Sequence, residues 1–245
     1  MIPGLLASEV AAALREFIVA GFETETPPFA GEFQRLVEEQ LDGEAFVKGP
    51  YLSIGLPFKK GRETRNWFAG FQTNYPPFLH QQQAWQRLAS DKLAQNTLVA
   101  TGTGSGKTEC FLYPLLDHCQ RAGGPGIKAP GIKAPGIKAI VIYPMNALAT
   151  DQAKRFADII HHQQALNGLR VGLFVGGNDE SPFKTMMSDR VISCKETMRS
   201  EPPDILLTNY KMLDYLLMRP KDQALWEGNN SETLKYLVVD ELHTF

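Results

Sequence analysis

Residues 101–108 read Thr-Gly-Thr-Gly-Ser-Gly-Lys-Thr and stand between the apolar stretch Thr97–Thr101 and the amphipathic stretch Lys107–Ala122. A glycine-rich turn between a strand and a helix is the setting of a phosphate-binding loop. Glycines let several backbone N–H groups point at phosphate oxygens, and the helix N-terminus adds about half a positive charge. The strict pattern has glycine at position 101, where this chain has threonine, a departure that one large class of NTPases tolerates. The stretch predicts a P-loop NTPase.

The residues of this loop have defined uses around a nucleoside triphosphate. Lys107 would reach the β- and γ-phosphates, and the Thr108 hydroxyl would ligate Mg²⁺. The backbone and small side chains of Thr103, Gly104, Ser105 and Gly106 would surround the phosphates.

A second signal is the stretch Val238-Val239-Asp240-Glu241-Leu242-His243, in which an aliphatic run ends in two carboxylates. At the carboxyl edge of a parallel sheet, Asp240 would hold Mg²⁺ and Glu241 would orient or deprotonate the attacking water. Many strands end in a solvated acidic turn, so this pair is a weak signal alone and a strong one beside a phosphate loop. His243 alone is more typical of a surface or core histidine.

The chain from Pro77 onward alternates short apolar runs with amphipathic stretches of helical length. The runs are apolar on both faces, which is typical of parallel strands covered by helices. Alternation of this kind predicts an α/β fold, a RecA-like doubly wound parallel sheet. The expected strands are Thr97–Thr101, Ala139–Tyr143, Leu169–Val175, Asp204–Thr208 and Leu234–Asp240, with helices including Lys107–Ala122 and Ala147–Leu166.

A small, mostly helical segment over residues 1–75 is expected before the ATP-binding domain of residues 76–245. Ser8 is a plausible N-cap of a first helix, and a second helix is expected over Glu32–Leu41, with Phe33, Leu36 and Val37 facing inward. Gly43 would end the second helix.

One low-complexity feature interrupts the pattern. Pro125–Ala129, Pro130–Ala134 and Pro135–Ala139 each read Pro-Gly-Ile-Lys-Ala, and only the third copy runs into an expected strand. The basic residues Arg121, Lys128, Lys133 and Lys138 have no acidic neighbour in sequence between Asp117 and Asp151. A basic binding loop is one interpretation. An expanded helix-to-strand loop is favoured, because such loops lie opposite the ligand edge of the sheet.

Composition limits the classes of function. A net charge of −2 excludes a module that binds nucleic acid mainly through bulk positive charge. The three cysteines lack metal-ligand spacing, no secretory leader is visible and no apolar stretch is long enough to span a membrane, so the expected compartment is the cytoplasm.

Together these motifs resemble those of the superfamily 2 helicases, whose acidic motif reads Asp-Glu-x-His or Asp-Glu-Ala-Asp. Two further stretches are similar in style to the Lhr/MrfA-like branch, which includes DruE-type defence helicases. They are Tyr143-Pro144-Met145-Asn146-Ala147-Leu148-Ala149 and the stretch from Leu206 to Asp214. The resemblance covers about residues 76–245. It implies an ATP- and Mg²⁺-dependent enzyme in which His243 is part of the catalytic motif.

The resemblance also assigns binding residues. Gln81 would read adenine as the glutamine motif. Single-stranded nucleic acid, with DNA favoured, would lie across five residues that follow the second, third and fourth expected strands: Asn146, Gly176, Gly177, Thr208 and Asn209. In the family such groups hold strand phosphates through amides, hydroxyls and backbone N–H groups.

Helicases of this kind need a Ser/Gly-Ala-Thr motif and a second RecA-like lobe after the acidic motif, and this chain ends at Phe245. The second lobe supplies an arginine worth about 10³–10⁵ in rate in other NTPases. The expectation is therefore the front portion of a larger helicase, nearly inactive by itself. Two alternatives stay open, another P-loop NTPase and a non-catalytic nucleotide- or DNA-binding module. A GTPase should show Asn-Lys-x-Asp, which Asn209-Tyr210-Lys211 does not supply.

Overall fold

The computed structural model describes residues 3–21, 29–41, 57–62, 67–68, 70–73, 75–90, 94–102, 104–122, 136–177 and 181–244. The chain divides into two compact units, Met1–Pro57 and Phe58–Phe245. Gly43, Thr103 and the first two copies of the repeat lie outside the described residues.

The described residues of the first unit form two helices that contact each other, α1 (Pro3–Gly21) and α2 (Glu32–Leu41). Ser8 is not an N-cap, because α1 begins at Pro3 and the Ser8 hydroxyl donates to the Leu5 carbonyl at 2.8 Å. Of the residues expected to face inward on α2, Val37 is buried and Leu36 is 54% exposed. Two helices bury only the side chains along their line of contact, so much of their apolar surface stays exposed.

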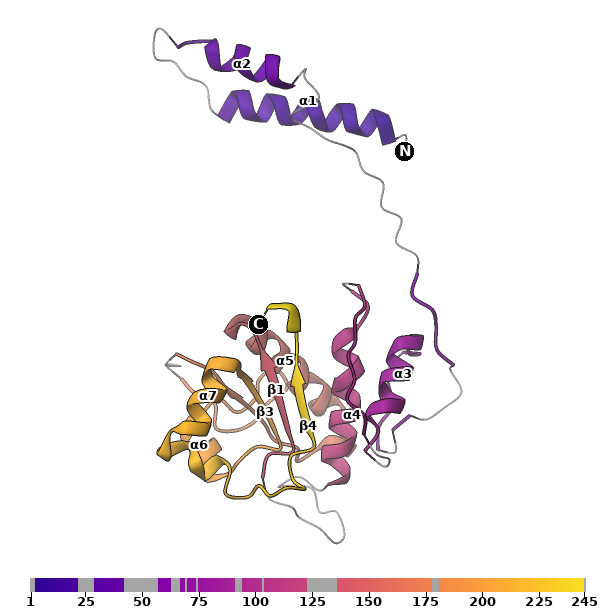
Figure 1. The fold of residues 1–245 in the computed structure, drawn as a ribbon, viewed down its shortest axis with the longest axis vertical. Coiled ribbons are helices and arrows are strands. Elements are labelled where there is room, and N and C mark those ends of the chain that lie inside the picture. Colours follow the sequence, from indigo (N-terminus) through magenta and orange to yellow (C-terminus); the bar gives the residue numbers. More distant parts are fainter. Residues whose placement is uncertain are drawn as a thin grey trace. The chain divides into compact units, whose positions relative to one another are not determined.

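The described residues of the second unit form four parallel strands in the order β2-β3-β1-β4, of which Figure 1 labels β3, β1 and β4. Their bounds are β1 Ala139–Tyr143, β2 Val171–Phe174, β3 Ile205–Asn209 and β4 Tyr236–Val239. In register, Ala139 of β1 lies beside Ile205 of β3 and Tyr236 of β4. The parallel α/β sheet expected from the alternating pattern is confirmed.

Helices cover the two faces of this sheet, and β1 shows why. All five residues of β1 are buried, with Ala139, Val141 and Tyr143 in one core and Ile140 and Ile142 in the other. The first core also holds side chains of α3 (Leu79–Leu88), α4 (Lys107–Arg121) and α5 (Asn146–His162). The second holds side chains of α6 (Lys195–Ser200), α7 (Tyr210–Met218) and the 3-10 helix η2 (Pro220–Leu225). Two further short 3-10 helices are η1 (Gln164–Leu166) and η3 (Leu242–Thr244).

The expected first strand is not formed. Residues 94–102 form neither a helix nor a strand, and Leu98 is 77% exposed. The edge strand β4 also departs from expectation, because Leu237 is 61% exposed although its pattern predicts cover on both faces. An apolar run becomes a buried strand only where a neighbour accepts its backbone hydrogen bonds and a helix covers its side chains.

An aromatic cluster joins residues before Asn74 to the second unit. The rings of Phe68 and Phe71 stack at 5.0 Å, and Phe68 lies 5.2 Å from Trp85 of α3 and 5.9 Å from Tyr113 of α4. All four side chains belong to the first core. The second compact unit therefore begins at Phe58, and the extent of the ATP-binding domain over residues 76–245 stays a prediction.

The third repeat copy is part of the core. Lys138 is 1% exposed, and its Nζ donates to Asp204 Oδ1 at 2.8 Å and to the Gly136 carbonyl at 3.0 Å. Arg121 pairs with Asp117 on α4. These two members of the apparently unpaired basic run have acidic partners in space, which weakens the interpretation as a basic binding loop.

Within the described part of the chain, every helix is too short or too polar to cross a lipid bilayer.

Candidate nucleotide and nucleic-acid site

The glycine-rich loop turns tightly into the N-terminus of α4. Gly104 and Gly106 both have a φ of 75°, in the left-handed region that favours glycine. A Cβ on Gly106 would lie 2.4 Å from Gln81 Nε2, so this position has no room for a larger residue. A Cβ on Gly104 would meet nothing within 4 Å, which leaves open space at the tip of the loop. The described residues of the loop thus form a tight turn directly before a helix N-terminus, the setting in which backbone N–H groups bind phosphate.

Two side-chain contacts hold the loop together. The hydroxyl groups of Thr101 and Ser105 are 2.7 Å apart, and Ser105 is fully buried. Lys107 Nζ donates to the Thr101 carbonyl at 3.2 Å, so its ammonium group lies over the start of the loop. Thr101, which stands where the strict pattern has glycine, therefore stabilises the loop through both its side chain and its carbonyl.

Gln81 connects α3 to the loop. It is 1% exposed, its Oε1 accepts from the Phe78 N–H at 2.9 Å, and its Nε2 donates to the Gly106 carbonyl at 3.1 Å. His80 Nε2 also lies 2.9 Å from the Ser105 carbonyl. Gln81 retains one N–H and one lone pair. Its contact to adenine stays a prediction, and in this structure it positions the phosphate loop.

Asp240 and Glu241 follow β4 at the carboxyl edge of the sheet. Asp240 Oδ1 accepts from the Glu241 N–H at 3.0 Å, and Glu241 has a φ of 51°, unusual for a residue other than glycine. Burial raises the pKa of Asp240, while the charge of Lys107 lowers it. Lys107 and Asp240 are therefore within electrostatic range of each other, and their joint role at a nucleotide stays a prediction. His243 is exposed on η3, with its Nδ1 3.5 Å from Glu241 Oε2.

A hydrogen-bonded chain of three residues links the ends of β1, β2 and β3. Asn209 Nδ2 donates to Asn146 Oδ1 at 2.6 Å, and Asn146 Nδ2 donates to the Gly176 carbonyl at 3.4 Å. Asn209 Oδ1 accepts from the Met212 N–H at 2.7 Å and so caps α7. Asn146, Gly176 and Gly177 are exposed and Asn209 is half-buried. The structure thus brings four of the five expected nucleic-acid residues to one edge.

Thr208 is the exception. It is fully buried, and its hydroxyl donates to the Phe174 carbonyl at 2.7 Å. The side chain joins β3 to β2 beneath the exposed edge. The expectation that Thr208 contacts the nucleic-acid strand directly is therefore corrected. Thr208 is one residue before Asn209, where the alternation of side chains along a strand turns it into the core.

An ion pair between the buried Glu109 and the partly exposed Arg155 is not evident from the sequence. Glu109, in the first turn of α4, is 5% exposed and forms an ion pair with Arg155 of α5. Tyr75 donates to Glu109 Oε1 at 3.1 Å, and Trp85 Nε1 donates to the Glu109 carbonyl at 2.9 Å. A carboxylate directly after the Lys-Thr pair, in a helix expected to be buried, is the one local signal. Its partner lies 46 positions away, which no spacing rule predicts.

The DEAD/DEAH box helicase family matches residues 78–245, which include the loop, the acidic motif and all the strand-end residues. The chain belongs to the DEAD/DEAH box helicase family. The resemblance to superfamily 2 helicases is confirmed by this match. The family's ATP dependence agrees with the phosphate loop.

The proteins to which this chain is similar include helicases of the Lhr/MrfA-like branch. The chain is 26% identical to the Druantia protein DruE of Escherichia coli (strain UMEA 4076-1) over 95% of its own length and 18% of that protein. It is also 26% identical to the ATP-dependent helicase Lhr-Core of Methanothermobacter thermautotrophicus, over 61% of this chain and 16% of the relative. The crystal structure of the DUF1998 helicase MrfA bound to DNA and AMPPNP has a TM-score of 0.53 and 24% identity, and the match covers 77% of this chain and 23% of MrfA. The chain thus spans less than a fifth of the length of the curated relatives DruE and Lhr-Core.

Proposed function

We propose that this chain is the ATP-binding front portion of an ATP-dependent nucleic-acid helicase or translocase, with DNA as the favoured strand. The observation that carries the proposal is the helicase family match over residues 78–245, which spans both the glycine-rich loop before α4 and the acidic motif after β4. DNA is favoured because the MrfA structure with a similar fold was solved with DNA and AMPPNP.

Phosphate oxygens would be held by N–H groups of the loop and of the first turn of α4, together with the Lys107 ammonium group. Lys107 would exchange its present acceptor, the Thr101 carbonyl, for phosphate oxygens. Bound Mg²⁺ would neutralise phosphate charge, with Thr108 and Asp240 as the residues to hold it. The Asp240 carboxylate fits this role, because it lies in a partly buried site whose cost of ionisation a cation would offset.

Glu241 would act on water rather than on the nucleotide. We therefore expect Glu241→Gln to bind ADP and ATP as tightly as the wild type, within about twofold, while any slow hydrolysis is reduced. Equilibrium titration and phosphate release measured on both proteins check this. A Glu241→Gln protein that loses nucleotide affinity would place the carboxylate in the binding site, and a wild type that binds neither nucleotide would contradict the proposed function.

Single-stranded nucleic acid would lie on the edge formed by Asn146, Gly176, Gly177 and Asn209. Amide and backbone donors contact phosphates without reading bases, so affinity should follow strand length rather than sequence. The salt dependence should be shallow, with a slope of about 0.7 for each contacted phosphate.

We expect Asn146→Ala and Asn209→Asp each to weaken binding of labelled oligo-dT. Asn209→Asp keeps an acceptor for the Met212 N–H, so α7 stays capped, but it removes a donor and adds a charge that repels phosphate. Asn167→Ala serves as the control, because this exposed asparagine precedes β2 at the opposite end of the strands. Fluorescence anisotropy in which all three variants match the wild type would show that the edge is wrongly placed.

A further inference from the structure

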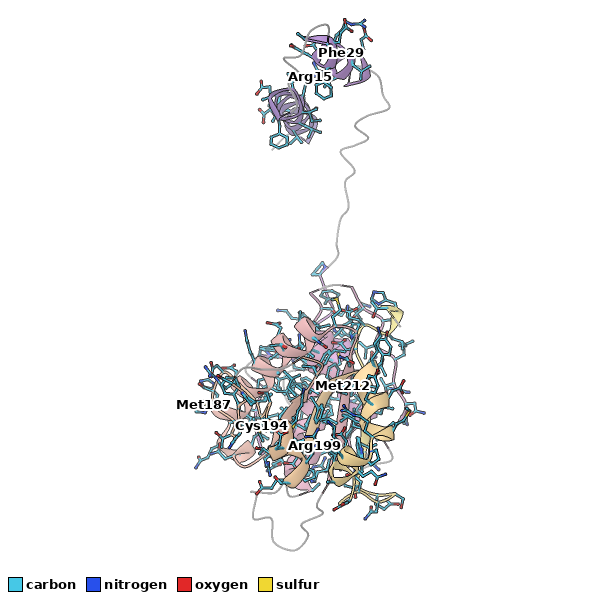
Figure 2. All side chains as sticks on the ribbon, turned by 90° about the vertical axis from the view of Figure 1, so that its left-hand side faces the viewer. Arg15, Phe29, Met187, Cys194, Arg199 and Met212 are labelled. Atoms are coloured by element: carbon cyan, nitrogen blue, oxygen red, sulfur yellow. The ribbon has the colours of Figure 1, made fainter. Side chains whose placement is uncertain are left out.

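A cavity of about 560 Å³ lies beside the strand-end residues, on the face of the sheet that carries α6 and α7. Its walls come from the end of β2, the Gly176–Gly177 turn, α6, α7 and the start of η2. Figure 2 labels two of its residues, Arg199 and Met212. The proposed nucleotide site shares none of the residues that line it.

The lining is strongly basic. Four cationic side chains, Lys195, Arg199, Arg219 and Lys221, line the cavity, and Glu196 is the one carboxylate among its lining residues. Glu196 forms an ion pair with Arg199 at 3.3 Å, and its side chain is 80% exposed, so solvent screens this pair. The chain as a whole has a net charge of −2, so its composition does not explain the positive charge concentrated at this cavity.

A buried carboxylate behind the cavity wall fixes the two arginines in place. Asp222 is fully buried, with its Oδ1 2.8 Å from Arg199 Nε and its Oδ2 2.7 Å from an Arg219 nitrogen. One buried carboxylate thus holds two guanidinium groups at the wall of the cavity. Side chains fixed in this way lose little conformational entropy when an anion binds.

The two lysines have no carboxylate partner among the described residues. Lys195 Nζ donates to the Gly177 carbonyl at 2.8 Å and lies 5.7 Å from the centre of the Phe174 ring. The Lys221 ammonium group forms no hydrogen bond or ion pair with the described part of the chain. Lys221 is exposed, and Lys195 is half-buried beside the Gly176–Gly177 turn.

We infer that this cavity binds a phosphate group of the nucleic-acid strand, next to the phosphates held at the Asn146–Gly176–Asn209 edge. The inference rests on the proposed function and deepens it. Gly176 and Gly177 belong to both the edge and the cavity wall, so a strand that crosses the edge reaches the cavity without a gap. Free inorganic phosphate has the same chemistry, and the test must separate the two sources.

The test compares the double variant Lys195→Ala/Lys221→Ala with the control Lys154→Ala/Lys235→Ala in the full chain. The control removes the same charge from two exposed lysines, one on α5 and one just before β4. Circular dichroism melting establishes that both proteins fold. Anisotropy with labelled oligo-dT is then measured across a series of NaCl concentrations.

The expected result is weaker binding by the cavity variant and an unchanged salt slope for the control. The slope of the cavity variant should fall by about 0.7 for each strand phosphate that its cavity no longer neutralises. Equal slopes for the cavity variant and the control would overturn the inference and leave the edge intact. A second outcome would also overturn the inference. If inorganic phosphate binds to the wild type but not to the cavity variant, while both proteins bind the oligonucleotide equally, the cavity binds free anions. A wild type that binds no oligonucleotide would contradict the nucleic-acid part of the proposed function itself.

Discussion

Replacing Lys107 with alanine should reduce ADP affinity by about 10- to 100-fold, the loss expected for one or more hydrogen bonds between an ammonium group and phosphate. Lys107 Nζ lies 3.2 Å from the Thr101 carbonyl and is a half-buried cation at the loop. The loop itself should keep its shape, because the Thr101–Ser105 and Gln81–Gly106 contacts do not involve the lysine.

Isothermal titration of ADP into wild type and Lys107→Ala measures this effect, with Lys235→Ala as a control of the same charge. Lys235 is exposed and lies just before β4, at the end of the strand away from Asp240. Equal ADP affinity in wild type and Lys107→Ala would remove the loop from the nucleotide site.

The largest expected loss of stability follows Lys138→Ala. This change leaves the Asp204 carboxylate buried without its cation, which costs about 3–5 kcal/mol. Burial already raises the pKa of Asp204, and Lys138 is the main group that opposes this rise. A loss of this size lowers the melting temperature by about 10 °C, at roughly 2–4 °C per kcal/mol for a unit of this length.

The repeat offers a matched control within the same sequence. Lys133 occupies the same position in the second copy, and the ion pair with Asp204 is made by Lys138 of the third copy. We expect Lys133→Ala to change stability by less than about 0.5 kcal/mol. Replacing both partners in Lys138→Met/Asp204→Leu should recover most of the loss, since an apolar pair of similar volume often replaces a buried ion pair without cost. Equal melting temperatures for Lys133→Ala and Lys138→Ala would contradict a structural role for the third copy.

Local sequence signals are sufficient for most of the fold. The four strands β1–β4 are short apolar runs bounded by polar or turn residues, and each begins within two residues of its expected start, with Leu169 and Leu234 lying just outside β2 and β4. Residues 97–101 have the same local pattern but no strand. Their local pattern shows only that the residues are apolar. Whether another strand lies alongside to form hydrogen bonds depends on the rest of the fold, so the pattern does not show it.

The candidate site, like the fold, is predictable from local sequence only in part. The loop and Asp240 are predictable because the chemistry requires particular residues in sequence next to a strand end. Thr208 is predicted at the exposed edge because the resemblance assigns it to a contact motif after a strand, and only the structure shows that its side chain is buried against β2. The Glu109–Arg155 and Lys138–Asp204 pairs join residues 46 and 66 positions apart, and no spacing rule connects residues at such distances.

Hydrogen–deuterium exchange with and without ADP and Mg²⁺ would show where on the chain the nucleotide binds, and so whether the glycine-rich loop and the acidic motif form one site. We predict slower exchange at the backbone amides of residues 104–108, whose N–H groups would contact phosphate, and at Asp240 and Glu241. Protection confined to another region, such as the cavity between α6 and α7, or no protection at the loop when ADP is saturating, would contradict a nucleotide site at this edge of the sheet.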